Sequence, residues 1–370
     1  MSAQADLIII GAGFYGLRLA LRYGAKGMKI TVLDRLPEAM TKASYINQAR
    51  VHNGYHYPRS YITAKASHDN YQRFMREYPE CVDNNFTHLY AVARSGSQIS
   101  EYQFQQFCEI VGSPLLPVRP DEAALFNQDR IAAVFRADEV AFDAAALRRT
   151  LLAEISAYSN IAIHYNTDVT ALDQTGGAIT VTTNNGDFTA PRVLNVSYSN
   201  LNDIIRRARF LEAEKELLNI DIEIAEVALC TAPPELQHIG ITIMDGPFWA
   251  TLPFPADRLR SLTHVRYTPH TSYSSRQVAT PPEEILSAYH AETNFYHMRA
   301  DAARYVPAVA EFQYARSLFT NKAILANHDH DDARPILLKC HSREPVFISV
   351  LGSKLDSIYA LEEAMADYLD

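Results

Sequence analysis

Short apolar runs of strand length and a helix-compatible stretch alternate at the start of this chain. Residues 6–10 read D-L-I-I-I, and residues 29–33 read K-I-T-V-L and are followed by Asp34. The stretch 17–24 between them is compatible with a helix. Apolar runs of four to five residues around such a stretch predict strand, helix and strand, a βαβ unit over 6–34.

The rest of the pattern is mixed at first and then strand-rich. A polar, aromatic loop is expected at 40–60, and D-Q-T-G-G at 173–177 reads as a turn between two strands of a meander. We expect helices at 61–79, at 141–158, in the region 282–320 and at 355–369, and strands at 161–165, 168–172, 178–183, 192–196, 222–231, 240–254, 260–267 and 346–351.

The turn after the first strand carries the sequence G-A-G-F-Y-G at 11–16. Gly11 allows the tight turn, and Gly13 lacks a Cβ, so the backbone can approach a pyrophosphate closely. Gly16 lets the helix pack tightly on the strand, and the helix N-terminus offers free N–H groups to phosphates. Asp34 is placed to accept hydrogen bonds from a ribose diol. A glycine turn in an ordinary α/β unit would not explain this acid, so the pattern indicates a dinucleotide site.

The end of the chain repeats the strand, glycine turn and helix order. Residues 346–351 form an apolar run, followed by Gly352, Ser353, Lys354 and a helical stretch. In glutathione-reductase-type flavoproteins the end of the chain returns as a strand to the first sheet. An NAD-dependent dehydrogenase, which ranks third among the functions considered, would not need this returning strand. We therefore expect an α/β fold with a discontinuous Rossmann-like domain at 1–60, 140–205 and 330–370, and an inserted β-rich α+β substrate domain at 61–139 and 206–329.

Composition narrows the function class. The chain has 370 residues and a net charge of −9, and no block of Lys and Arg stands out, so we expect neither nucleic acid nor an anionic membrane surface as a partner. No apolar run reaches membrane-span length, and a strand begins within a few residues of the N-terminus. Four scattered cysteines without CxxC spacing indicate reduced thiols, and we expect a cytoplasmic protein.

Four places along the chain carry a resemblance to a known family. The first is 11–34, and the second is N-Q-A-R-V-H-N-G-Y-H-Y-P at 47–58. The third combines D-V-T-A-L at 168–172 with V-L-N-V at 193–196, and the fourth combines A-R-P at 333–335 with G-S-K at 352–354. In this order and spacing the chain resembles the FAD-dependent oxidoreductases of the D-amino-acid oxidase superfamily, which includes glycine oxidase and L-2-hydroxyglutarate dehydrogenase.

The resemblance implies FAD as the cofactor and an oxidoreductase as the activity. Such an enzyme would oxidise a C–N or C–O bond of a small polar substrate, an amino acid or a 2-hydroxy acid, by hydride transfer to flavin N5. It implies that FAD is bound by Gly11, Gly13, Phe14, Tyr15, Gly16, Asp34, Arg35, Asn47, Gln48, Ala49, Val169, Gly352, Ser353 and Lys354.

One departure concerns the segment after Asn195. The family usually carries a small residue and a glycine there, whereas this chain has Ser197, Tyr198 and Ser199. We expect Tyr198 to narrow the site or to alter the exposure of the flavin. The insert at about 210–330 matches no member of the family, so the resemblance does not carry substrate identity.

Histidines and tyrosines of the 47–58 segment are the first catalytic candidates. An alcohol substrate needs a base, so His52 or His56 could accept its proton, and the alternative for each is a hydrogen bond to backbone beside the flavin. Tyr55 and Tyr57 are expected to line the substrate pocket rather than to act as acid or base.

Cations are the second group of candidates. A carboxylate substrate suits a two-point arginine clamp, for which Arg334 is the candidate and Arg266 the reserve; a surface salt bridge is the alternative for Arg334. Lys354 is a candidate to stabilise the anionic reduced flavin, or else a solvated lysine at a helix start. The run H-D-H-D-D at 328–332 is expected to be a solvated loop and not a metal site.

A second functional hypothesis keeps the fold and changes the role. The chain could be a flavoprotein of a biosynthetic pathway that acts on a carbohydrate or a carrier-bound intermediate, or a flavin-binding protein without ordinary oxidase turnover. The sequence leaves open the electron acceptor, which is O2 or another molecule, whether the flavin is covalent, and the oligomeric state.

Overall fold

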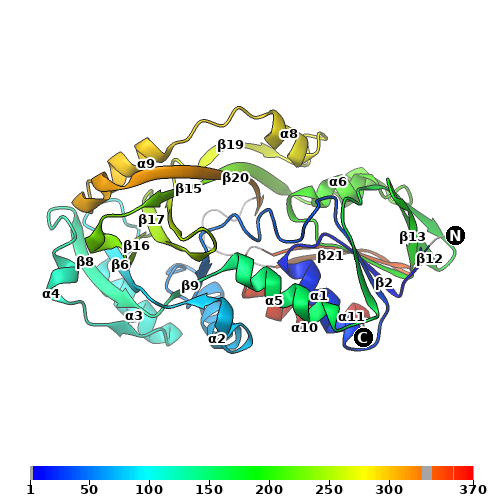
Figure 1. The fold of residues 1–370 in the computed structure, drawn as a ribbon, viewed down its shortest axis with the longest axis horizontal. Helices are drawn as coiled ribbons and strands as arrows, with labels where there is room; N and C mark the ends of the chain where they lie inside the picture. Colours follow the sequence, from blue (N-terminus) through cyan, green and yellow to red (C-terminus); the bar gives the residue numbers. More distant parts are fainter. Residues whose placement is uncertain (1–2, 327–335, 353, 370) are drawn as a thin grey trace.

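A mostly parallel sheet forms one end of the molecule, which we describe from a computed structural model covering residues 3–326, 336–352 and 354–369 (Figure 1). Its strand order is β10-β3-β2-β14-β22-β21, in which the first five strands run parallel and β21 is antiparallel. Within the described ranges these strands are β2 (Leu7–Ile10), β3 (Ile30–Leu33), β10 (Ile161–His164), β14 (Arg192–Asn195), β21 (Leu337–Arg343) and β22 (Val346–Leu351).

The two ends of the chain meet in this sheet. Val193 of β14 is in register with Ile8 of β2 on one side and with Phe347 of β22 on the other. The α/β fold class expected from the sequence is confirmed, and the expected strands at 161–165, 192–196 and 346–351 are present. Strand β21 was not predicted. The division of the chain into two domains at the stated boundaries stays a prediction.

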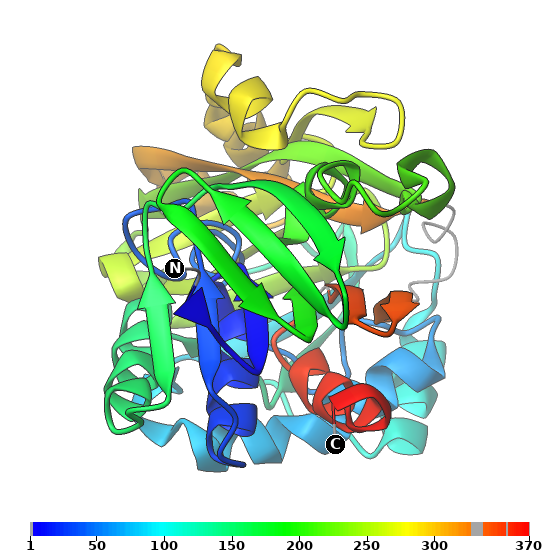
Figure 2. The same ribbon diagram turned by 90° about the vertical axis from the view of Figure 1, so that its right-hand side faces the viewer.

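Helices cover one face of the parallel sheet, where α1 packs between α5 and α10 (Figures 1 and 2). Helix α5 begins at Ala144, later than predicted, because the Asp143 side chain caps it by accepting from the N–H groups of Ala145 and Ala146. The helices at this end are α1 (Phe14–Gly24), α2 (Tyr61–Glu77), α5 (Ala144–Ser156), α10 (Ser357–Ala364) and α11 (Ala366–Leu369).

Helix α2 belongs to the same hydrophobic core, although the sequence assigned residues 61–139 to the substrate domain. Tyr71 and Phe74 of this helix are buried together with Leu17 of α1 and Ile348 of β22. The core beneath the parallel sheet therefore includes a helix from the region between the first βαβ unit and α5.

A large antiparallel-rich sheet forms the other end of the molecule. Its order is β19-β15-β18-β17-β16-β6-β8-β7, and β20 pairs with β15 outside this path. In the part of the chain that the structure describes, these strands are β6 (Thr87–Ala93), β7 (Leu115–Leu116), β8 (Ile131–Ala137), β15 (Ile220–Thr231), β16 (Ile239–Met244), β17 (Trp249–Phe254), β18 (Leu259–His264), β19 (Pro269–Ser274) and β20 (Gln313–Leu325).

The prediction of helix over 282–320 is wrong for residues 313–320, which belong to a strand. Helices α8 and α9 are present, but β20 begins at Gln313 and pairs antiparallel along the whole of β15, from Thr231 opposite Gln313 to Ile220 opposite Leu325. Pairing with a long neighbouring strand overrides the local preference of an Ala-, Arg- and Leu-containing segment for helix. The helices beside the large sheet are α3 (Glu101–Val111), α4 (Pro120–Ala123), α8 (Pro282–Ala288) and α9 (Phe295–Ala302). Helix α6 (Leu201–Arg206) follows β14 and lies at the other end, where it contacts β22 and α7 (Ala213–Glu216) (Figure 1).

Two small sheets complete the described part of the fold. One has the order β1-β13-β12-β11 and contains the predicted meander, with β1 (Ala3–Gln4) parallel to β13. The other has the order β4-β9-β5 and ties the loop after β3 to the start of α5. Their remaining strands are β4 (Arg50–Val51), β5 (Val82–Asp83), β9 (Val140–Phe142), β11 (Val169–Thr175), β12 (Ala178–Thr183) and β13 (Gly186–Ala190).

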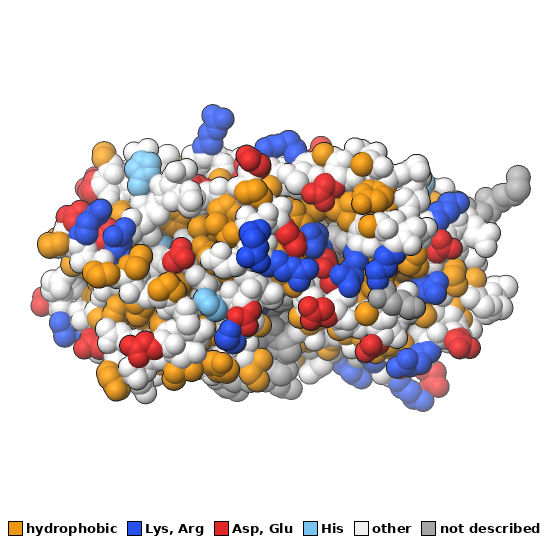
Figure 3. Space-filling view, turned by 90° about the horizontal axis from the view of Figure 1, so that it is seen from below, with side chains coloured by type: hydrophobic (Ala, Val, Ile, Leu, Met, Phe, Trp, Pro, Cys, Tyr) orange, Lys and Arg blue, Asp and Glu red, His pale blue; other side chains and the backbone are white. Residues whose placement is uncertain are grey.

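The lower face of the molecule, over α1, α2, α5 and α10, mixes acidic and basic side chains (Figure 3). Arg18 of α1 pairs with Glu362 of α10 and Glu77 of α2, each at 2.9 Å. These ion pairs connect α1 to α2 and α10, and Glu362 is buried between the helices. Within the described ranges, no helix combines the length and apolar character needed to cross a bilayer.

We expect Ile348→Ala to lower the free energy of unfolding by about 2–5 kcal/mol, because Ile348 is fully buried between the parallel sheet and its helices. Ile62→Ala is the matched control, since this side chain on α2 is 82% exposed, and it should change stability by less than about 0.5 kcal/mol. Urea denaturation measures both. Equal effects of the two substitutions would contradict the assignment of β22 to the core.

Candidate functional site

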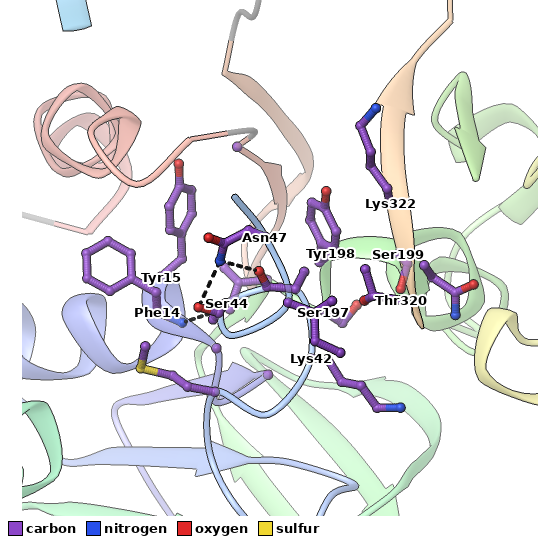
Figure 4. Close-up of a pocket in the computed structure, with 18 of the residues that line it drawn as sticks. Phe14, Tyr15, Lys42, Ser44, Asn47, Ser197, Tyr198, Ser199, Thr320 and Lys322 are labelled. Atoms are coloured by element: carbon purple, nitrogen blue, oxygen red, sulfur yellow. Dashed lines mark hydrogen bonds between the residues drawn. The ribbon is translucent and has the colours of Figure 1, made fainter. Parts of the chain in front are cut away.

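A cavity of about 510 Å³ runs between the parallel sheet and the large sheet, within the size range of small-molecule sites. Its walls come from the first βαβ unit, the loop at 40–57, the link between β14 and α6, strands β15 and β20, and the turn after β22. Figure 4 shows Ser44 and Asn47 on the loop, Tyr198 to their right, and Thr320 and Lys322 farther to the right on β20. Segments that are far apart in the sequence therefore meet around one cavity.

The three glycines of the 11–16 turn have different roles. Gly11 has a φ of +113°, and a Cβ there would lie 2.9 Å from the Val196 carbonyl oxygen. A Cβ on Gly16 would lie 1.9 Å from the Gly11 carbonyl oxygen, so this glycine is required by the fold. A Cβ on Gly13 would meet only the Ser44 hydroxyl, at 3.2 Å. Gly13 therefore leaves open space beside the N-terminus of α1, which fits the close approach of a diphosphate.

Asp34 lies at the end of β3 and lines the same cavity. Its Oδ2 accepts a hydrogen bond from the Ala12 N–H at 2.6 Å, and its Oδ1 accepts one from the Leu36 N–H at 2.8 Å. Burial raises the pKa of the carboxyl, and the two N–H donors oppose this shift. Each carboxylate oxygen retains acceptor capacity, so the arrangement fits a ribose hydroxyl.

The loop after Asp34 is held by its own hydrogen bonds. The Phe14 N–H donates to Ser44 Oγ at 3.0 Å. The Asn47 side chain donates to the carbonyls of Ala43 and Ser44 and accepts from the Ala49 N–H, which stabilises a φ of +53° at Ala49 (Figure 4). Of the predicted cofactor residues, Phe14, Arg35, Asn47, Gln48 and Val169 line the cavity, whereas Gly16 and Ala49 act through the backbone shape.

The turn after β22 reaches the cavity from the other end of the chain. The Tyr15 hydroxyl donates to the Lys354 carbonyl at 2.6 Å, and a Cβ on Gly352 would lie 2.2 Å from the Tyr15 ring. The Lys354 ammonium donates to Ser67 Oγ at 2.8 Å and lies 4.7 Å from the centre of the Tyr57 ring. Gly352 and Lys354 both line the cavity, and Ser353 is outside the described residues.

Tyr198, the departure noted in the sequence, also lines the cavity. It adopts a φ of +56°, a left-handed conformation that is uncommon for residues other than glycine. Burial raises the pKa of its hydroxyl to about 12, and a hydrogen bond from the backbone of Ala323 on β20 opposes this shift. The tyrosine thus keeps the backbone shape suited to glycine and fills the space between β14 and β20 with its ring.

A buried polar network closes one end of the cavity. Arg50, His52 and His56 line this end, and the rings of the two histidines stack with their centres 5.2 Å apart. The Arg50 guanidinium reaches His56 Nδ1 at 3.2 Å, the Tyr90 hydroxyl at 3.1 Å and Thr242 Oγ1 at 3.0 Å. The arginine side chain is 1% exposed.

Glu139, between β8 and β9, is the acid of this network, and its side chain is fully buried. It lies 3.5 Å from His52 Nδ1, 3.4 Å from His88 Nδ1 and 3.9 Å from the Arg50 guanidinium. Burial alone would raise the pKa of this carboxyl, but His52 and Arg50 hold it well below its usual range. Burial lowers the pKa of His52, and it lowers the pKa of His88 to about 3.

Sequence reasoning missed Arg50 as a site residue and missed Glu139 entirely. Arg50 lies inside the quoted 47–58 motif, so its position was a usable signal. Glu139 is a single acid in a segment without a motif, and only the folded chain brings it to the histidines.

Other predicted site residues lie elsewhere. Tyr55, a predicted substrate contact, is fully buried away from the cavity, where its hydroxyl donates to the Pro114 carbonyl. Arg266, the reserve cation, is exposed in the turn between β18 and β19 and does not line the cavity. Arg334 and the 328–332 run lie outside the described residues. Among the described residues, no group of three or more His, Cys, Asp or Glu side chains could hold a metal ion.

Comparisons with known proteins agree with this geometry. A family model described as "FAD dependent oxidoreductase" matches residues 6–329. The FAD-dependent monooxygenase FPY4 of Fusarium mangiferae is 23% identical over 99% of this chain and 91% of its own length. Glycine oxidase from Geobacillus kaustophilus superposes with a TM-score of 0.73 at 14% identity, over 100% of this chain and 95% of its own. L-α-glycerophosphate oxidase from Mycoplasma pneumoniae, solved with FAD bound, also gives 0.73, at 15% identity over 99% and 94% of the two chains.

We expect Gly13→Val to abolish FAD binding while the protein still folds, because the new side chain enters the open space beside α1. Gly16→Ala should instead lower the melting temperature with or without FAD, since its Cβ would collide with the Gly11 carbonyl. Flavin absorbance after purification and the thermal shift on adding FAD distinguish the two; saturating ligand at 100 Kd adds about 2.7 kcal/mol of stability. Full flavin content in Gly13→Val would refute this cradle.

Proposed function

The chain belongs to the family of FAD-dependent oxidoreductases, and on that premise we propose that it oxidises a hydroxyl-bearing carbon of a small polar substrate to a carbonyl. A 2-hydroxy acid is the substrate class we favour over an amino acid. The observation that carries this choice is His52, which reaches the cavity beside the buried Glu139 carboxylate.

FAD is the cofactor, and this chain's residues fit it. Gly13, the N-terminus of α1 and Ser44 would hold the diphosphate, and Asp34 would hold a ribose. When bound, FAD supplies the acceptor for a hydride at flavin N5. His52, Tyr57 and Lys354 line the far end of the same cavity, where the substrate would meet the flavin.

A hydroxyl substrate needs a base at this end, and His52 has the properties of one. Burial lowers its pKa, so the imidazole is neutral near pH 7 and can accept a proton. Once protonated, the imidazolium would be stabilised by the nearby Glu139 carboxylate at 3.5 Å. An amine can lose its proton to solvent before it binds and does not require such a pair. Arg334, outside the described residues, stays the proposed clamp for a substrate carboxylate.

The test is anaerobic bleaching of the bound flavin by a panel of 2-hydroxy acids and the matching 2-amino acids. We expect bleaching by a hydroxy acid, and His52→Ala should slow it by about 10²–10⁴-fold with unchanged flavin content, the usual contribution of a general base. His290→Ala, at an exposed histidine outside the cavity, is the control. Bleaching by amino acids alone, or an active His52→Ala variant, would contradict the proposal.

Monooxygenation is the second candidate, because FPY4, matched over 99% of this chain, is named an FAD-dependent monooxygenase. The two reactions differ in their oxygen balance. Alcohol oxidation passes two electrons to an acceptor and adds no oxygen atom to the product. Monooxygenation consumes a reductant such as NAD(P)H, places one atom of O2 in the product and releases the other as water.

Turnover under 18O2 separates these reactions once a substrate is known. For the proposed alcohol oxidation we expect no 18O in the carbon product, as measured by mass spectrometry within minutes to limit carbonyl exchange. One 18O atom per product together with NAD(P)H consumption would establish the monooxygenase reaction instead.

A further inference from the structure

The surroundings of His52 come from several distant segments. Glu139 faces its Nδ1, while His56 stacks on its ring and Tyr57 packs at 5.2 Å between ring centres. The other charged or titratable groups that act on it are Arg50, Asp356 and, across the carboxylate, His88. Among these, the Glu139 carboxylate is the hydrogen-bond acceptor that Nδ1 faces.

The Glu139 carboxylate is fixed from several directions. The Asn53 N–H donates to Oε1 at 3.0 Å, and the Tyr90 hydroxyl donates to Oε2 at 2.6 Å. Tyr90 is oriented in turn by Arg50, which donates to its oxygen at 3.1 Å. A fully buried carboxylate with these donors has a defined position and keeps its negative charge.

We propose that Glu139 is a positioning residue that fixes the hydrogen of His52 on Nδ1 and leaves Nε2 as the proton acceptor on the cavity side. The carboxylate is an acceptor only, so the ring nitrogen that faces it must carry hydrogen. Neither His52 Nδ1 nor His88 Nδ1 has a hydrogen bond of normal geometry to another described residue, and both face this carboxylate.

His88 gives independent support for this arrangement. Its Nε2 lies 3.0 Å from Thr242 Oγ1, and Thr242 Oγ1 also accepts from Arg50 at 3.0 Å. The Thr242 hydroxyl hydrogen is therefore available to His88 Nε2, which makes that nitrogen the acceptor and Nδ1 the donor. In this arrangement both His52 and His88 carry hydrogen on Nδ1 and direct it to the Glu139 carboxylate.

The catalytic consequence rests on the proposed function, but the tautomer does not. Fixing the hydrogen on Nδ1 prepares Nε2 to take a hydroxyl proton without reorganisation of the ring. The negative charge of Glu139 raises the pKa of His52 against the larger effect of burial. Removing the Glu139 charge must therefore lower the pKa of His52 further. Removing a hydrogen-bond donor that competes for the carboxylate must raise the pKa of His52.

The direct test is 15N NMR of histidine-labelled holoprotein, with the His52 signals identified by their loss in His52→Gln. At pH 7 we expect the Nδ1–H tautomer, with a shift typical of an unprotonated Nε2. In Glu139→Gln the tautomers should mix, and the midpoint of the His52 titration should move to lower pH. Tyr90→Phe frees the carboxylate of one donor, so the midpoint should move to higher pH.

Kinetics give the second readout. With a hydroxy acid that bleaches the flavin, Glu139→Gln should lower kcat by about 10–100-fold, the usual cost of losing a residue that orients a functional histidine, with KM nearly unchanged. The acid limb of the pH profile should move to lower pH in Glu139→Gln and to higher pH in Tyr90→Phe. Glu139→Asp keeps the charge and should restore the position of the limb.

Glu122→Gln is the matched control. Glu122 is also buried and ion-paired, but it pairs with Arg119 and Arg136 and does not line the cavity. Its substitution should leave the His52 signals and the pH profile unchanged.

The outcomes separate this inference from the proposed function. An Nε2–H tautomer in the native protein, or unchanged His52 signals in folded, flavin-loaded Glu139→Gln, overturns the role of Glu139. If Glu139→Gln does not fold, the titration shift in Tyr90→Phe decides, and an unmoved or lowered midpoint overturns it. The expected tautomer together with an inactive hydroxy-acid panel refutes only the proposed reaction.

Discussion

Parallel pairing in one sheet is the constraint on which the site depends. Parallel strands present their carboxyl ends at the same edge of a sheet, where ligands of open α/β folds bind. Here β2 leads into Gly11, β3 into Asp34, β14 into Ser197 and β22 into Gly352, and all four residues line the cavity. If β22 did not return beside β14, the Tyr15 hydroxyl would lose its acceptor at Lys354 and the cavity would lose one wall.

The buried Glu139 network depends on electrostatic compensation rather than on strand pairing. Taking a carboxylate out of water costs several kcal/mol, and only a full set of hydrogen bonds and a nearby cation offset this cost. Arg50 and Asn53 of the loop at 47–58 and Tyr90 of β6 provide that set, so it comes from two separate segments. Such a network contributes little net stability, but its hydrogen bonds join Arg50 of the loop at 47–58 to Tyr90 of β6 and Thr242 of β16. These bonds restrain the segment that carries His52 and His56.

Features that depend on contacts between residues close in the sequence could be predicted, and features that depend on contacts between distant segments could not. The first βαβ unit, the glycine turn and Asp34 depend on contacts within about 30 residues, so the pattern at 6–34 predicted them. FAD and the family followed from motifs in order along the chain. The sequence predicts helix up to residue 320, but the structure of β20 depends on pairing with β15, some 90 residues away in the sequence. Glu139 has no motif, and Tyr55 turned inward because its hydroxyl finds the Pro114 carbonyl.

The two ends of the cavity also differ in the kind of contact that they offer to a ligand. At the glycine turn the contacts available to a cofactor are backbone N–H groups and the missing Cβ of Gly13, and many sequences supply these. Tyr198, which follows β14 and lines the same cavity, likewise adopts the left-handed backbone conformation. At the far end the cavity is lined by the side chains of Arg50, His52, His56 and Lys354, so a substitution there would change the groups that a substrate meets. Glycine oxidase and L-α-glycerophosphate oxidase, which share this fold at 14% and 15% identity, are named for different substrates. His52, the proposed base, lies at this side-chain-lined end, so substitutions there are the direct test of the proposed reaction.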